Sequence, residues 1–87
     1  MVELRVFGKD INDAGYREAL ARAQEAAESF GDQVSVVGYD STSEEAEELG
    51  IGRFPAVAVG RRLVAVATIP PVSRLTALLS AALEYGE

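Results

Sequence analysis

The segment from Phe54 to Ile69 is the part of the sequence that most restricts the fold. It contains two short apolar runs, FPAVAVG and RLVAVATI, which meet at Gly60 and Arg61. Each run is valine-rich and too short for an ordinary helix, and Gly60 can adopt the positive φ angle that a tight hairpin turn requires. The segment therefore predicts two antiparallel strands, and their nearly continuous apolarity predicts that both faces are buried.

The residues before this hairpin predict two more strands with a helix between them. Alternating apolar residues predict a strand over residues 2–7, and a run of valines predicts another over residues 33–39. Between them, apolar positions recur at helical spacing from Asp13 onward. This spacing predicts an amphipathic helix of about 17 residues, with Gly31 as its C-terminal cap.

Two further helices complete the pattern. The segment DSTSEEAEELG predicts a short helix that starts with a capping box between Thr42 and Glu45. The segment PPVSRLTALLSAALEYGE predicts a last helix with Pro71 near its first turn. The expected inner face of that helix consists of Val72, Leu75, Leu78, Leu79, Ala82 and Leu83. The order β-α-β-α-β-β-α predicts an α/β fold, in which one mixed four-stranded sheet carries the helices packed on it.

Composition limits the chemistry that this chain can perform. Its 87 residues, of which 48% are hydrophobic, predict one folded domain over residues 1–87. The chain has neither cysteine nor histidine, so it lacks a thiolate, a disulfide, soft metal ligands and the usual base at neutral pH. We therefore expect no enzyme, no catalytic residue, no metal and no cofactor.

Charge and the start of the chain predict where the protein works. The net charge is −6 and Lys9 is the single lysine, so the clustered basic side chains that bind nucleic acid are missing. Glu3 and Arg5 interrupt the first apolar run, which fits neither a signal peptide nor a membrane span. We expect a cytoplasmic protein that binds neither nucleic acid nor a membrane.

The order of the predicted elements, with a proline opening the third strand, resembles the thioredoxin-like superfamily. The nearest likeness is to the very small thioredoxin- and glutaredoxin-like proteins, which have a Cys-x-x-Cys helix start and a hairpin of the form TPALVV-DG-KVV. Here the hairpin is FPAVAV, then Gly60 and Arg61, then RLV, and the segment IPPV precedes the last helix. The resemblance covers nearly the whole chain and implies a cis peptide bond between Phe54 and Pro55.

The resemblance also shows what this chain lacks. The residues DAGY, from Asp13 to Tyr16, stand where the family has its two cysteines. Neither end of this segment can form a thiolate, so the dithiol exchange of the family is chemically impossible here. What the resemblance implies is a groove, in which the residue before Pro55 offers backbone hydrogen bonds to a bound peptide.

The candidate binding site beside this proline consists of Asp13, Tyr16, Arg53, Phe54 and Pro55. Asp13 has a second interpretation as the N-terminal cap of its helix, worth roughly 1 kcal/mol. Tyr16 has a second interpretation as a core residue with a solvated hydroxyl. Arg53, Arg61 and Arg62 form either a basic rim for an acidic partner or a solvated hairpin tip that protects a sheet edge.

These observations lead to one functional expectation and two alternatives. A cysteine-free thioredoxin-like domain keeps its groove and an exposed strand edge, so we expect a redox-inactive domain that acts through protein contacts. The partner is either another protein, with this chain as adaptor or subunit, or a second copy in a homodimer. The alternatives are a carrier of a small anionic metabolite held by Arg53, and a helper in thiol chemistry whose partner supplies the sulfur.

Overall fold

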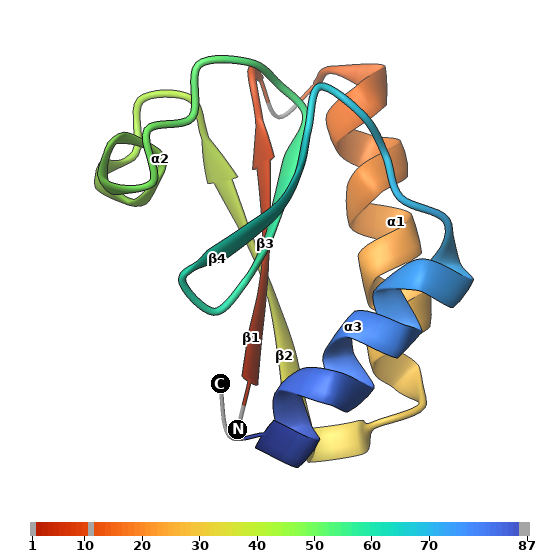
Figure 1. Ribbon diagram of the computed structural model, residues 1–87. Helices are drawn as coiled ribbons and strands as arrows, with labels where there is room; N and C mark the ends of the chain where they lie inside the picture. The colour runs from red at the N-terminus through yellow and green to blue at the C-terminus, as the bar shows by residue number, and fades with distance from the viewer. Residues whose placement is uncertain (1, 11, 86–87) are drawn as a thin grey trace.

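A four-stranded mixed sheet forms the centre of the molecule. The computed structural model of the protein describes residues 2–10 and 12–85. The strand order is β2-β1-β3-β4 (Figure 1). β1 (Val2–Gly8) pairs in parallel with β2 (Val34–Asp40) and antiparallel with β3 (Ala56–Val59), which pairs antiparallel with β4 (Arg62–Val66). The predicted mixed sheet of an α/β fold is therefore confirmed.

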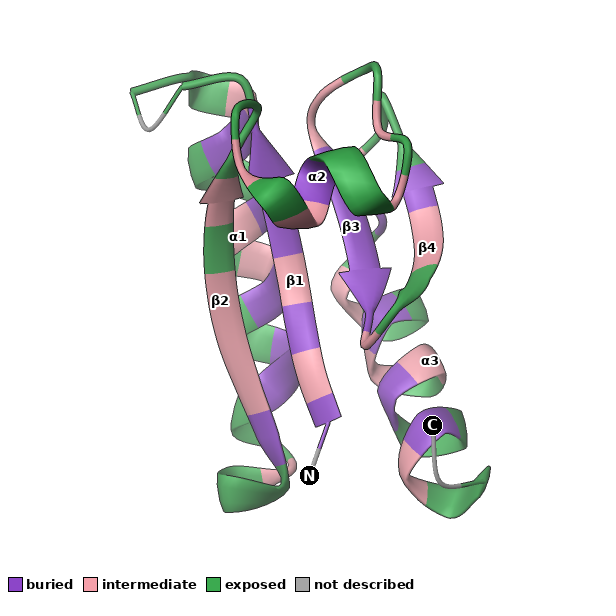
Figure 2. Ribbon diagram, turned by 90° about the vertical axis from the view of Figure 1, so that its left-hand side faces the viewer, coloured by how far each residue is buried: buried purple, intermediate pink, exposed green. Residues whose placement is uncertain are grey.

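Helices cover the two faces of the sheet unequally. α1 (Ala14–Glu28) and α3 (Val72–Tyr85) lie side by side on one face, while the short α2 (Glu44–Glu48) lies on the other (Figures 1 and 2). None of the helices in residues 2–10 and 12–85 has the length and apolarity needed to cross a membrane.

Alternation along β1 explains why both faces of the sheet are covered. Leu4 and Val6 are fully buried in the main core, which they share with residues of α1 and α3. Phe7 points to the opposite face and is buried in a smaller core with Ala46 of α2. Because successive side chains of a strand point to opposite faces, one strand supplies both cores.

The first helix begins as expected but ends earlier. Asp13 is its N-cap, with its carboxylate accepting a hydrogen bond from the helix start, as the capping interpretation predicts. The helix ends at Glu28, and Gly31, with φ of 57°, opens a 3-10 turn instead of capping α1. The expected cap at Gly31 is therefore wrong, because Phe30 already turns back to donate its N–H to the carbonyl of Ala27 at 3.0 Å.

The capping box predicted at Thr42 and Glu45 is also wrong. Ser43 is the N-cap of α2, and its Oγ accepts the N–H of Ala46 at 3.2 Å. Thr42 instead donates its N–H and its hydroxyl to the carboxylate of Asp40, at 2.9 and 2.7 Å. This local turn holds Thr42 outside the helix, since an Asp side chain competes for nearby backbone donors.

The C-terminal hairpin is buried on one strand only. All four residues of β3 are buried, whereas Ala65 is the one buried residue of β4. The prediction of two-sided burial is thus correct for β3 and wrong for β4, because β4 is the outer strand of the sheet. The turn has the expected positive φ at Gly60, and β4 ends before Ala67, which has φ of 60°.

The last helix presents the predicted face to the sheet. Leu75, Leu79 and Ala82 are buried in the main core. The other three residues of the expected inner face, Val72, Leu78 and Leu83, are partly buried against it. Pro71 lies directly before the helix, and its carbonyl accepts the N–H groups of Arg74 and Leu75 at 3.1 Å.

Candidate functional site

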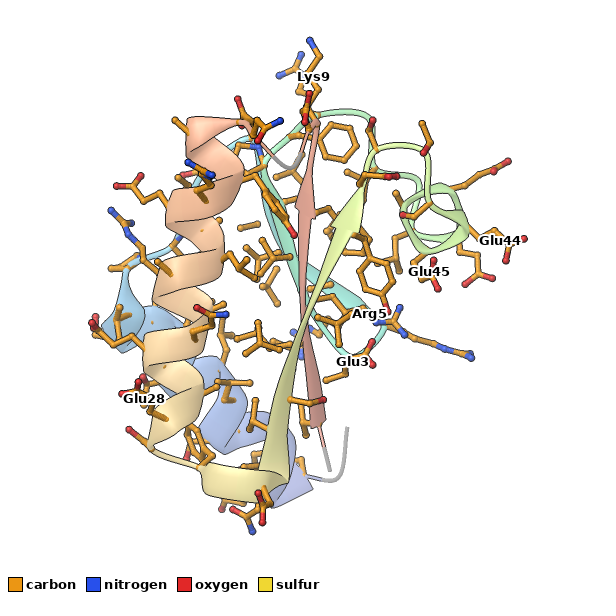
Figure 3. The ribbon with its side chains drawn as sticks, turned by 180° about the vertical axis from the view of Figure 1, so that it is seen from behind. Glu3, Arg5, Lys9, Glu28, Glu44 and Glu45 are labelled. Carbon is orange, nitrogen blue, oxygen red and sulfur yellow. The ribbon has the colours of Figure 1, made fainter. Side chains whose placement is uncertain are left out.

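A pocket of about 460 Å³ lies at the end of the sheet where β1 and β2 finish. Its lining residues are Lys9, Ser41, Gly52, Arg53, Phe54 and Ala67. Lys9 follows β1, Ser41 follows β2, and the next three residues precede β3. Figure 3 shows Lys9 projecting from this end of the molecule. Ligands commonly bind outside the carboxyl ends of parallel strands, so this pocket, here called the Lys9–Arg53 pocket, is the candidate site.

Phe54 lines this pocket and has two backbone groups without a partner among the described residues. Its side chain is half-buried and packs against the smaller core, which fixes the residue in place. Within residues 2–10 and 12–85, no group hydrogen-bonds to the N–H or the carbonyl of Phe54. Phe54 therefore has a backbone donor and acceptor that no described group uses.

Pro55 connects the pocket to the first helix. The peptide bond between Phe54 and Pro55 is cis. A Cβ atom built on Gly15 would lie 3.5 Å from Cδ of Pro55, so the proline ring packs beside the first turn of α1. The carbonyl of Pro55 accepts the N–H of Ala67 at 2.8 Å. Pro55 thus positions Phe54 between the start of α1 and the end of β4.

Asp13 lies near Pro55 but does not line the Lys9–Arg53 pocket. Its Oδ2 atom accepts the N–H of Tyr16 at 3.1 Å, which satisfies one of the free donors at the start of α1. The same oxygen lies 3.1 Å from the position of a Cβ built on Gly15. The contacts of Asp13 are accordingly those of a helix cap.

Tyr16 lies in the main core, as its second interpretation predicts. Its exposed fraction is 9%, and its ring lies directly against Gly8 of β1. Its hydroxyl lies against Gly38 of β2. Tyr16 also lines a small pocket of about 170 Å³ near the ends of β1 and β2. Tyr16 is not among the residues that line the Lys9–Arg53 pocket.

The basic rim is assembled differently from the prediction. Arg53 precedes β3, whereas Arg61 and Arg62 follow it at the hairpin turn, so the length of β3 separates them. The cation that accompanies Arg53 is Lys9. The local sequence does not connect these two residues, although a polar residue directly after a predicted parallel strand is a general signal for a site at the sheet edge.

Acidic groups adjoin the pocket on the side of β2. A second hollow of about 350 Å³ is lined by Lys9, Asp10, Asp40, Ser41 and Thr42. Hydrogen bonds from the hydroxyl and the N–H of Thr42 hold the pKa of Asp40 below its ordinary value. Residues 2–10 and 12–85 contain no cluster of three or more His, Cys, Asp or Glu side chains that could hold a metal ion.

Comparison with known proteins adds no family to this description. No protein-family model matches the sequence, and no curated protein matches it.

Proposed function

We propose that this chain is a thioredoxin-like domain without thiol chemistry. The strand order β2-β1-β3-β4, a parallel pair joined through α1 and a terminal antiparallel hairpin support this proposal. Two helices on one face and one on the other also support it (Figure 1). The chain has no cysteine. At the positions of the family's redox pair, Asp13 caps a helix and Tyr16 fills the core.

The domain acts through protein contacts at the Lys9–Arg53 pocket. The observation that carries this proposal is Phe54, which lines the pocket and whose N–H and carbonyl have no hydrogen-bond partner among the described residues. An extended peptide can pair with exposed main-chain groups and gain affinity from them. Lys9 and Arg53 favour a peptide that carries a carboxylate, since hydrogen bonds between charged groups are the stronger ones. The expected partner is an acidic peptide segment of another protein.

Selection of binders from a random peptide library tests this function. We expect the selected peptides to be acidic and to change the NMR signals of Lys9, Ser41, Arg53 and Phe54. Arg53→Ala should weaken binding by about 1.5–3 kcal/mol, the usual value of a hydrogen bond to a charged group. Arg61→Ala, a matched loss of one arginine at the far end of β3, should leave binding unchanged. Signal changes confined to other surfaces, or equal losses in both variants, would refute the proposal.

A small anionic ligand is a second candidate for the same pocket. The observation that favours it is the pairing of Lys9 with Arg53 in a chain whose net charge is −6. Inorganic phosphate or a small dicarboxylate that binds the folded state should raise the thermal unfolding midpoint, with about 2.7 kcal/mol of stabilisation at a hundredfold excess over Kd. Lys9→Ala and Arg53→Ala should abolish that shift. A midpoint that does not respond to either anion removes this candidate.

A further inference from the structure

The two edges of the sheet are built differently. β4, at one edge, is five residues long and begins with the exposed Arg62. Its pairing with β3 is interrupted by an irregularity between Val57 and Ala58, and the chain leaves the strand through Ala67 with a positive φ angle. Short length, a basic residue and an interrupted ladder are the usual devices that keep an edge strand from pairing with another chain.

β2, at the other edge, lacks these devices. It is seven residues long and pairs in continuous register with β1 from Val34 to Asp40. It contains no Lys, Arg or Pro, and it carries no charge between Val34 and Tyr39. Figure 2 shows β2 at the margin of the sheet, and no strand in residues 2–10 and 12–85 pairs with its outer side. A regular, uncharged edge of this length is a template for strand addition.

We propose that a second copy of this chain covers the β2 edge, through antiparallel pairing about a two-fold axis at Val37. This register pairs all seven residues of β2 with their counterparts. Val37 meets Val37, Val36 meets Gly38, Ser35 meets Tyr39, and Val34 meets Asp40. Paired residues differ by an even number of positions, so each side chain stays on its own face and the two sheets join into one.

Charge does not oppose a second copy in this arrangement. Asp40 is the one charged residue of β2, and the two-fold register places it opposite the buried Val34 rather than opposite the other Asp40. The protein has a net charge of −6, yet within β2 no like charges stand directly opposite each other in this register. A two-fold contact also closes on itself, because both copies use the same strand and no further β2 edge remains. A dimer, not a fibre, is the result.

Charge reversal at Val37 provides the test, read by sedimentation equilibrium. The wild-type protein should show a concentration-dependent species of twice its 9.2 kDa mass. Val37→Glu and Val37→Lys should each weaken dimerisation by about tenfold, because each places two like charges opposite one another. An equimolar mixture of the two variants should form the heterodimer, in which the charges at position 37 are opposite.

Matched variants on the other edge make the result specific. Val66 is 40% exposed on β4, and Val66→Glu and Val66→Lys should leave dimerisation unchanged. A wild-type protein that stays monomeric, or a dimer that Val66 variants weaken and Val37 variants do not, would overturn the proposal. Hydrogen exchange gives a second measurement that needs no variant. Dilution should speed exchange at residues 34–40 and leave 62–66 unaffected, and equal responses of both strands would also overturn it.

This inference is independent of the Lys9–Arg53 pocket. The pocket residues lie outside β2, so peptide binding and dimerisation can succeed or fail separately.

Discussion

The hydroxyl of Tyr16 occupies the space that a side chain on Gly38 would need. Tyr16 belongs to the first turn of α1, and Gly38 lies near the end of β2. Gly8, at the end of β1, has no side chain, and the ring of the same tyrosine lies where a Cβ atom on Gly8 would be. Two glycines therefore allow α1 to start close to the sheet. This placement sets the distance between the helix start and Pro55, and so the position of Phe54 in the pocket wall.

Gly38→Ala should destabilise the fold by about 1–3 kcal/mol, because the added methyl group collides with the Tyr16 hydroxyl. Tyr16→Phe removes that oxygen and should restore much of the loss. Urea unfolding of the two single variants and the double variant measures the coupling between the two positions.

Gly8→Ala is the control for this pair. A methyl group on Gly8 would meet Cβ and Cγ of Tyr16, which phenylalanine keeps. Tyr16→Phe should therefore not restore the stability that Gly8→Ala loses. If it restored the stability of Gly8→Ala as fully as that of Gly38→Ala, this packing would be contradicted.

Replacement of Asp13 separates a structural from a binding role. Asp13→Ala should reduce stability by about 1 kcal/mol, because the N–H of Tyr16 loses its acceptor. Asp13→Asn should keep most of the stability, since an amide oxygen can accept the same bond. Both variants should bind selected peptides normally, as Asp13 does not line the Lys9–Arg53 pocket. Loss of peptide binding in the asparagine variant would assign Asp13 to the site.

Tyr39 makes stability depend on pH in the alkaline range. Burial raises the pKa of Tyr39, and the hydrogen bond that its hydroxyl donates to Oε1 of Glu3 at 3.1 Å raises it further. The folded state thus favours the neutral phenol. The resulting stabilisation is complete below the ordinary tyrosine pKa of about 10 and is lost as pH rises through the folded value.

Glu3→Gln should lower the pKa of Tyr39 toward its ordinary value, because it removes the negative charge beside the hydroxyl. An NMR titration of the ring signals of Tyr39 measures this change at the single residue. A rise of the Tyr39 pKa in this variant would contradict the role of Glu3.

Arg22 ties the first helix to the connection before the last one. Its Nη1 atom donates to the carbonyls of Ile69 and Pro70, at 3.0 and 3.4 Å. Arg22→Met keeps the apolar stem but removes both bonds, and should cost about 1–2 kcal/mol while speeding hydrogen exchange in residues 67–75. Arg17→Met, at an exposed position of the same helix, is the control and should change neither measurement.

Local patterns predicted the elements of this fold well. The observed elements match four local patterns. These are the alternating apolar residues of β1, the valines of β2, the glycine at the hairpin turn and the apolar inner face of α3. Errors occur where two local signals compete. The sequence predicts Thr42 as the N-cap of α2. In the structure the Thr42 hydroxyl donates to the carboxylate of Asp40, and Ser43 is the N-cap.

The site was less predictable because it is assembled from distant segments. Arg53, Phe54 and Pro55 are predicted from one short motif. Arg53 and Phe54 line the Lys9–Arg53 pocket, whereas Pro55 is not among its lining residues. Lys9 was missed, since its nearness to Arg53 depends on how the sheet brings the ends of β1 and β3 together. The proposed grouping of Arg53 with Arg61 failed for the same reason, as residues close in sequence lie at opposite ends of one strand.

The central position of β1 has a consequence for biosynthesis. Of the four strands in the sheet, β1 is made first, and both of its neighbours, β2 and β3, are made later. α1 can form from local residues, but the main chain of β1 stays open on one side until the residues up to Val59 have emerged. β1 thus lacks its full set of hydrogen-bond partners until both later strands have been synthesised.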